Sequence, residues 1–81
     1  MLTLDLFKTF TTLDIETTGL EKDARIIEIG LAHYENGRCV GTWQTLINPS
    51  MTISYDISLL TGITNEMVQD APIWDDIVSD F

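Results

Sequence analysis

Two acidic residues near the start of the chain are the strongest candidates for chemistry. Asp14 and Glu16 stand two positions apart in a segment where polar and apolar residues alternate. In a β-strand this spacing puts both carboxylates on one face, with backbone positions about 6–7 Å apart. Two like charges that close repel unless a cation lies between them, and hard divalent cations prefer carboxylate oxygens. The spacing fits a metal site, and it also fits two ordinary solvated acids at a strand end.

The segment after the acidic pair is suited to contact a ligand through its backbone. Thr17-Thr18-Gly19 offers two hydroxyl groups, several N–H groups and a residue without a side chain. A sugar or phosphate group can come close to the backbone where no Cβ is present, and clustered N–H groups suit anions. The acidic pair and this segment together form the candidate site.

Three strands are predicted to position the site. They are expected over residues 9–16, 25–34 and 38–47, where β-branched and aromatic residues are frequent. The second is almost continuously apolar, which is typical of a central strand covered on both faces. Asn36-Gly37 between the second and third predicts a two-residue hairpin turn, so these two strands should be antiparallel.

Short helices are predicted for the rest of the chain. One is expected over residues 56–61, stopped by Gly62, and a second over residues 65–69, capped by Thr64. A third should begin near Pro72, and its apolar face would carry Ile73, Ile77 and Phe81. Because Phe81 is core-facing and no stop signal follows it, residues 1–81 are expected to be the N-terminal part of a single domain.

Four segments resemble, in order and spacing, one family of nucleases. Residues 13–20, Leu-Asp-Ile-Glu-Thr-Thr-Gly-Leu, resemble the first motif of the DEDD (DnaQ-like) 3′→5′ exonuclease family, which includes the epsilon-type proofreading subunit of bacterial DNA polymerase III. Residues 25–30, residues 46–49, and residues 60–64 together with 70–72 are similar to its later segments. The resemblance implies an α/β, ribonuclease H-like fold. This chain would be its N-terminal portion, three antiparallel strands followed by helices and cut before the later catalytic motifs.

The resemblance also implies residue roles. Asp14 would bridge two Mg²⁺ or Mn²⁺ ions and Glu16 would hold one, so both would be catalytic and metal-binding. The substrate-binding residues would be Thr17, Thr18, Gly19, Leu20, Asp56 and Thr61. Among these, Leu20 would wedge beside the terminal base. Asp56 stands where the family often has a glutamate that bonds the 3′-hydroxyl, and Thr61 stands where some members have a histidine.

The implied reaction is hydrolysis of phosphodiesters at the 3′ end of single-stranded DNA, with a DNA polymerase subunit as a candidate partner. The family uses two further aspartates and a histidine or tyrosine base, and all of these lie in later motifs. His33, the single histidine, lies in the middle of a predicted strand and is expected to be structural. The 81-residue chain by itself is therefore predicted to be nearly inactive.

Composition limits the alternatives. The formal charge is −9, from 13 acidic and 4 basic residues, so the chain cannot hold a phosphate backbone by a basic groove alone. A single cysteine, Cys39, excludes an internal disulfide. There is no run of roughly 20 apolar residues that would predict a membrane span. These features favour a cytoplasmic protein.

Two other functions remain open at this level. The first is an RNA-trimming relative with the same chemistry, because the features that reject a 2′-hydroxyl are not visible in the sequence. The second is a non-catalytic module for binding nucleic acid or protein, which would pair or dimerise through an incomplete core. The facing carboxylates favour the enzyme, because an assembly module has no need of them.

Overall fold

The computed structural model describes residues 8–79 and contains one antiparallel sheet followed by three short helices. Strands β1 (Thr9–Thr17), β2 (Ile26–Glu35) and β3 (Arg38–Leu46) lie in the order β1-β2-β3. Helices α1 (Tyr55–Thr61), α2 (Asn65–Val68) and α3 (Trp74–Ser79) follow. The prediction of three antiparallel strands and then helices is confirmed, with element ends shifted by one or two residues.

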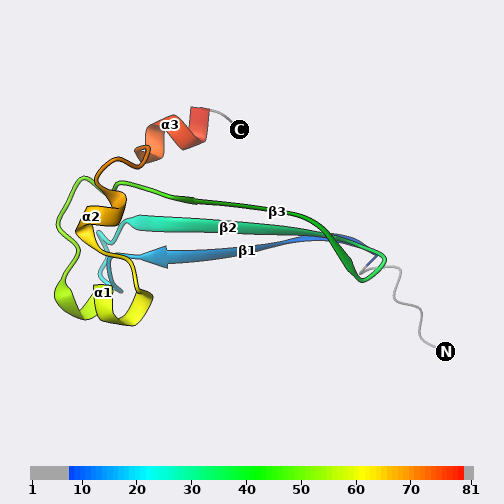
Figure 1. Ribbon diagram of the computed structural model, residues 1–81, viewed down its shortest axis with the longest axis horizontal. Helices are drawn as coiled ribbons and strands as arrows, with labels where there is room; N and C mark the ends of the chain where they lie inside the picture. The colour runs from blue at the N-terminus through cyan, green and yellow to red at the C-terminus, as the bar shows by residue number, and fades with distance from the viewer. Residues whose placement is uncertain (1–7, 80–81) are drawn as a thin grey trace.

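The helices gather at one end of the sheet, where β1 ends and β2 begins (Figure 1). The opposite end carries the β2–β3 hairpin, which extends away from the three helices (Figure 1). Its turn is the predicted one: Asn36 has φ 52° and Gly37 has φ 78°. Both values lie in the left-handed region that a two-residue hairpin turn requires and that asparagine and glycine tolerate.

A β-bulge interrupts the β1–β2 pairing beside the acidic pair. Glu16 pairs with Glu28 and Thr17 pairs with Ile26, so Ile27 is the extra residue on β2. An extra residue shifts the alternation of side chains between the two faces of a strand. Ile27 and Ile29 consequently belong to different core clusters, although simple alternation would put them on the same face.

The core consists of two small clusters on opposite faces of the sheet. On one face the buried residues are Ile27, Ile53, Ile63 and Val68, which come mostly from the segments around α1 and α2. On the other face they are Ile29, Ile47 and Ile77, the last of which belongs to α3. The expectation that β2 is covered on both faces therefore holds for its first half, where the helices lie, and not for the part that runs into the hairpin.

The predicted helix boundaries near α1 and α2 are confirmed by their caps. The Ser54 hydroxyl accepts a hydrogen bond from the Ile57 N–H at the start of α1. Gly62 ends this helix in the left-handed conformation, with φ 77°. The Thr64 hydroxyl accepts from the Met67 N–H, as an N-cap does.

The third helix begins two residues after Pro72, which was predicted to lie in its first turn. The Asn48 N–H donates to the Pro72 carbonyl, and Asn48 forms a parallel bridge with Ile73, so residues 72 and 73 are held against the chain after β3. The helix begins only at Trp74. Ile73 is consequently 41% exposed and does not share the buried face of Ile77, while Phe81 lies outside the described residues. Within residues 8–79, no helix is both long and apolar enough to cross a membrane.

One asparagine side chain ties the segment before α1 to α2. The Asn65 Oδ1 accepts from the Ile53 N–H at 2.7 Å, and its Nδ2 donates to the Ile53 carbonyl at 3.0 Å. We expect Asn65→Ala to lower the free energy of unfolding by about 1–3 kcal/mol, because two partly buried backbone groups lose their partner. Urea denaturation measures this. Asn65→Asp keeps the acceptor but turns a second oxygen toward the Ile53 carbonyl, so it should also be destabilised, and unchanged stability of either variant would contradict the two-bond argument.

Candidate functional site

The two acids face the same side of the sheet as α1 and α2. Glu16 pairs with Glu28 on β2, and Glu28 pairs in turn with Leu46 on β3, so the three side chains share one face. Leu46 packs on the cluster formed with the α1 and α2 segments. Asp14 lies two residues before Glu16 in the same continuous strand and therefore shares this face. The strand register therefore agrees with the predicted placement of Asp14 and Glu16 on one face of the sheet.

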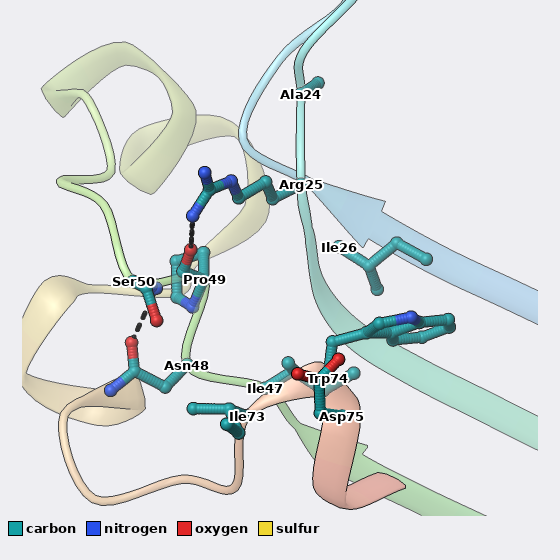
Figure 2. A pocket seen from close by; sticks show the side chains of 10 residues that line it. All are labelled: Ala24, Arg25, Ile26, Ile47, Asn48, Pro49, Ser50, Ile73, Trp74 and Asp75. Atoms are coloured by element: carbon teal, nitrogen blue, oxygen red, sulfur yellow. Dashed lines mark hydrogen bonds between the residues drawn. The ribbon is translucent and has the colours of Figure 1, made fainter. Parts of the chain in front are cut away.

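Neither carboxylate is neutralised within the described part of the chain. Asp14 is exposed and Glu16 is half-buried, and no hydrogen bond or ion pair joins either side chain to residues 8–79. The nearby cation Arg25 is used elsewhere: its guanidinium donates to the Pro49 carbonyl at 2.8 Å. Figure 2 shows this bond, which lies at a separate cavity of about 430 Å³ between the start of β2, the end of β3 and α3.

A cleft of about 840 Å³ adjoins the acidic pair, and we call it the acidic cleft. Its walls are the end of β1, the loop over residues 17–24, the segment 51–54 and α1. Every residue predicted for the site lines this cleft except Asp14: Glu16, Thr17, Thr18, Gly19, Leu20, Asp56 and Thr61. The fold thus brings together residues that are 40 positions apart in sequence.

The cleft carries negative charge only. Its acidic lining residues are Glu16, Glu21, Asp23 and Asp56, and no lysine, arginine or histidine lines it. Phosphate groups are repelled by such a surface unless cations accompany them. The repulsion of phosphate that the net charge of the whole chain predicts is therefore expected in particular at this cleft.

The threonine hydroxyls predicted to meet a substrate are engaged inside the chain. Thr18 is buried, and its Oγ1 accepts from the Arg25 N–H at 2.9 Å. The Thr17 Oγ1 donates to the Gly19 carbonyl at 2.7 Å. The Thr61 Oγ1 donates to the Ile57 carbonyl at 2.8 Å. These hydroxyls shape the cleft walls, and their use in this way is not visible in the sequence.

Other predicted residues are open to a ligand. Leu20 is fully exposed at the cleft, with a relative accessibility of 103%, so its side chain is free to pack on a flat apolar group. Asp56 is exposed in the first turn of α1. Gly19 has the Glu21 side chain lying against it.

Glu28 lies near the site and was not among the residues predicted for it. It lies directly opposite Glu16 on the same face and is half-buried. Directly opposed like charges destabilise a strand pair. A glutamate within an otherwise apolar strand was the one sign in the sequence that position 28 is unusual. That Glu28 lies opposite Glu16 depends on the register of the two strands, which the sequence does not give. His33, in contrast, lies away from the cleft, with its Nδ1 at 2.9 Å from the Thr11 Oγ1.

Asp14 and Glu16 are the candidate ligands for a cation within the described residues. Asp14 and Glu16 offer oxygen ligands, and the space beside them is open because a Cβ built on Gly30 would meet only the Asp14 carbonyl, at 4.0 Å. Within residues 8–79, no group of three or more His, Cys, Asp or Glu side chains is arranged to hold a metal ion. Two carboxylates by themselves would leave a hard divalent cation to take its remaining ligands from water or from groups outside the described residues.

Comparison with known proteins identifies the family. The model of the RNase_T exonuclease family matches residues 11–81. The chain belongs to this exonuclease family. The matched region includes the motif that suggested the DEDD (DnaQ-like) exonucleases, so that resemblance is confirmed. The chain is 44% identical over 73 residues to a DNA polymerase III PolC-type protein of Caldanaerobacter subterraneus subsp. tengcongensis, which covers 89% of this chain and 5% of that protein.

A further relative and two solved structures are consistent with this family. The chain is 41% identical over 73 residues to the DNA polymerase III subunit epsilon of Treponema pallidum, covering 89% of this chain and 34% of the subunit. Exonuclease X, solved in complex with 5′ overhanging duplex DNA, superposes with a TM-score of 0.75 at 30% identity, covering 86% of this chain and 41% of that one. A full-length 3′-exonuclease superposes with a TM-score of 0.81 at 22% identity, covering 90% of this chain and 27% of that one, which supports the ribonuclease H-like fold.

Proposed function

We propose that this chain is the N-terminal part of an exonuclease domain that removes nucleotides from the 3′ end of single-stranded DNA with the help of divalent cations. The observation that carries the proposal is the position of Asp14 and Glu16, which share one face at the edge of the acidic cleft and have no protein partner within residues 8–79. Membership of the exonuclease family and the likeness to DNA polymerase III proteins support the same reaction.

The proposed roles are those that the family resemblance implies, and the position of these residues at the acidic cleft supports them. Asp14 and Glu16 would hold Mg²⁺ or Mn²⁺, two ions in a complete domain. Bound divalent cations supply a water nucleophile and neutralise the charge that develops on the scissile phosphate. Leu20 would pack beside the terminal base, and Asp56 would face the terminal sugar. Thr17, Thr18, Gly19 and Thr61 would shape the walls that receive the terminal nucleotide. A DNA polymerase subunit and a cytoplasmic location belong to the same proposal.

The direct test is release of mononucleotides from a 5′-labelled single-stranded DNA in the presence of Mg²⁺ or Mn²⁺. We expect little turnover by the 81-residue chain itself, because two carboxylates leave most of the six ligand positions of Mg²⁺ to water. A longer protein containing this segment should shorten the DNA from its 3′ end. Robust turnover by the 81-residue chain would contradict the first expectation, and an intact 3′ end with the longer protein would contradict the proposed function.

A parallel assay with an RNA strand of matching sequence separates DNA trimming from RNA trimming. We favour DNA because the relatives at 44% and 41% identity are DNA polymerase III proteins. Faster degradation of the RNA strand would favour the RNA-trimming alternative.

An assembly function is favoured by one observation, the apolar face opposite the acidic pair. Leu13 is 67% exposed there, Ile15 42% and Trp43 40%, and all three lie on the face that carries Ile29. Such a face suits pairing with a second copy or another polypeptide. The sedimentation mass of the purified chain tests this alternative. A dimer would support assembly through this face, and a monomer would contradict pairing with a second copy.

A further inference from the structure

Strand β3 presents an open edge. Among the described residues its single neighbour in the sheet is β2, with which residues 41–46 pair without interruption (Figure 1). Just after the strand, the Ile47 N–H donates to the Ile27 carbonyl on β2. The backbone groups of an antiparallel strand point alternately to its two sides. Counting back from Ile47, Thr42 and Gln44 therefore turn their N–H and C=O groups away from β2.

The distribution of charge singles out this edge for contact with a second copy of the chain. The formal charge is −9, so two copies repel each other over most of their surfaces. Residues 36–55 contain no aspartate or glutamate, and the one charged residue of β3 is Arg38 at its start. The outer edge of β1, in contrast, belongs to the strand that carries Asp14 and Glu16. Two copies can approach through β3 without bringing carboxylates together.

We propose that the β3 edge is an interaction surface for a second copy of this chain, with the two β3 strands antiparallel about Trp43. In this register Thr42 of each copy lies opposite Gln44 of the other, so the four outward N–H groups each meet a carbonyl. The two Trp43 side chains face each other across the axis, where aromatic cross-strand pairs stabilise a sheet. A two-fold contact of this kind is closed, so it gives a dimer rather than a fibre. The proposal does not depend on nuclease activity.

Sedimentation of the 81-residue chain over a range of concentrations measures the dimer, and the mass should rise from monomer to dimer. Gln44→Pro removes an N–H that faces away from β2, a position where an edge strand tolerates proline. The dimer loses two of its four bonds, one from each copy, so its dissociation constant should rise at least about tenfold. Gln44→Thr keeps the N–H and is the matched control, which should dimerise as the unmodified chain does. A thermal melt checks that each variant is folded.

A disulfide tests the register independently of the proline variant. The exposed Cys39 is first replaced by serine. Trp43→Cys then puts two Cα atoms about 4.5 Å apart across the axis, within the range that a disulfide spans, and the four backbone bonds remain. Gln44→Cys is the control, because its two Cα atoms would lie diagonally, about 7–8 Å apart. Electrophoresis without reductant should show a covalent dimer for Trp43→Cys and little for Gln44→Cys.

Leu13→Gln separates the edge from the apolar face, because Leu13 is 67% exposed on that face but belongs to β1. It should leave the dimer in place. A monomer at every concentration, equal dimerisation of Gln44→Pro and Gln44→Thr, or equal cross-linking at positions 43 and 44 would each overturn the proposal. A dimer lost in Leu13→Gln and kept in Gln44→Pro would overturn it in favour of assembly through the apolar face. All of these outcomes leave the exonuclease proposal standing, since release of mononucleotides tests that separately.

Discussion

The Asp14→Asn variant should lose the rise in melting temperature that Mn²⁺ or Mg²⁺ produces in the unmodified chain. A cation that binds only the folded state at ten times its dissociation constant adds about 1.4 kcal/mol of stability. For a domain of this size that corresponds to roughly 6 °C or more. The substituted side chain would offer a neutral amide oxygen in place of a charged one, and the Glu16 carboxylate alone holds a hard cation weakly.

Glu16→Gln should also reduce this response, because the Asp14 carboxylate alone would hold a hard cation weakly. Without added metal, both variants should melt slightly above the unmodified chain, since the repulsion between carboxylates on one face is relieved. Differential scanning fluorimetry with millimolar cation measures all of these values.

Asp70→Asn is the control for this experiment, because it makes the same change at an exposed residue that lines neither cavity. It should keep the full response to the cation. If Asp14→Asn responds to Mn²⁺ as Asp70→Asn does, the cation does not bind at the acidic pair, and the proposed mechanism loses its basis.

Ile27→Ala should have the largest effect on folding. Ile27 is fully buried in the cluster beneath α1 and α2, with a relative accessibility of 0%. Removing three carbon atoms there costs the burial energy and leaves a cavity, together about 2–5 kcal/mol. A small domain has about 5–15 kcal/mol in total, so the variant should be largely destabilised or unfolded. Urea denaturation followed by circular dichroism measures the loss.

Val78→Ala is the matched truncation at a side chain that is 50% exposed on α3. It should change the free energy of unfolding by about 0.5 kcal/mol or less, since alanine is also the better helix former. Equal losses for the two variants would mean that the cluster around Ile27 does not hold the sheet and the first two helices together.

The elements of this fold that depend on local chemistry could be predicted from the sequence. The Asn36-Gly37 turn, the Gly62 helix end and the Thr64 cap each follow from backbone conformations or side-chain bonds that neighbouring residues decide. The facing of Asp14 and Glu16 is equally local, because alternation along one strand is enough to produce it. The resemblance of residues 13–20 to an exonuclease motif pointed to the family for the same reason, since a short continuous segment carries it.

What could not be predicted depends on contacts between distant segments. The bulge at Ile27 sends neighbouring isoleucines of β2 to opposite faces, and only the pairing with β1 reveals it. The late start of α3 comes from the bonds between Asn48 and residues 72 and 73. The pairing of Glu28 with Glu16 is likewise a matter of register.

For this chain, the sequence alone determined the acidic pair, the order of the elements and the family, because these rest on alternation, turn chemistry and a short motif. The tertiary structure decided which residues share the acidic cleft and that the threonine hydroxyls are already bonded within the chain. The physical reason is that a cleft is made where separate segments pack together. Its shape and charge follow from register and packing over tens of residues, which no local pattern contains.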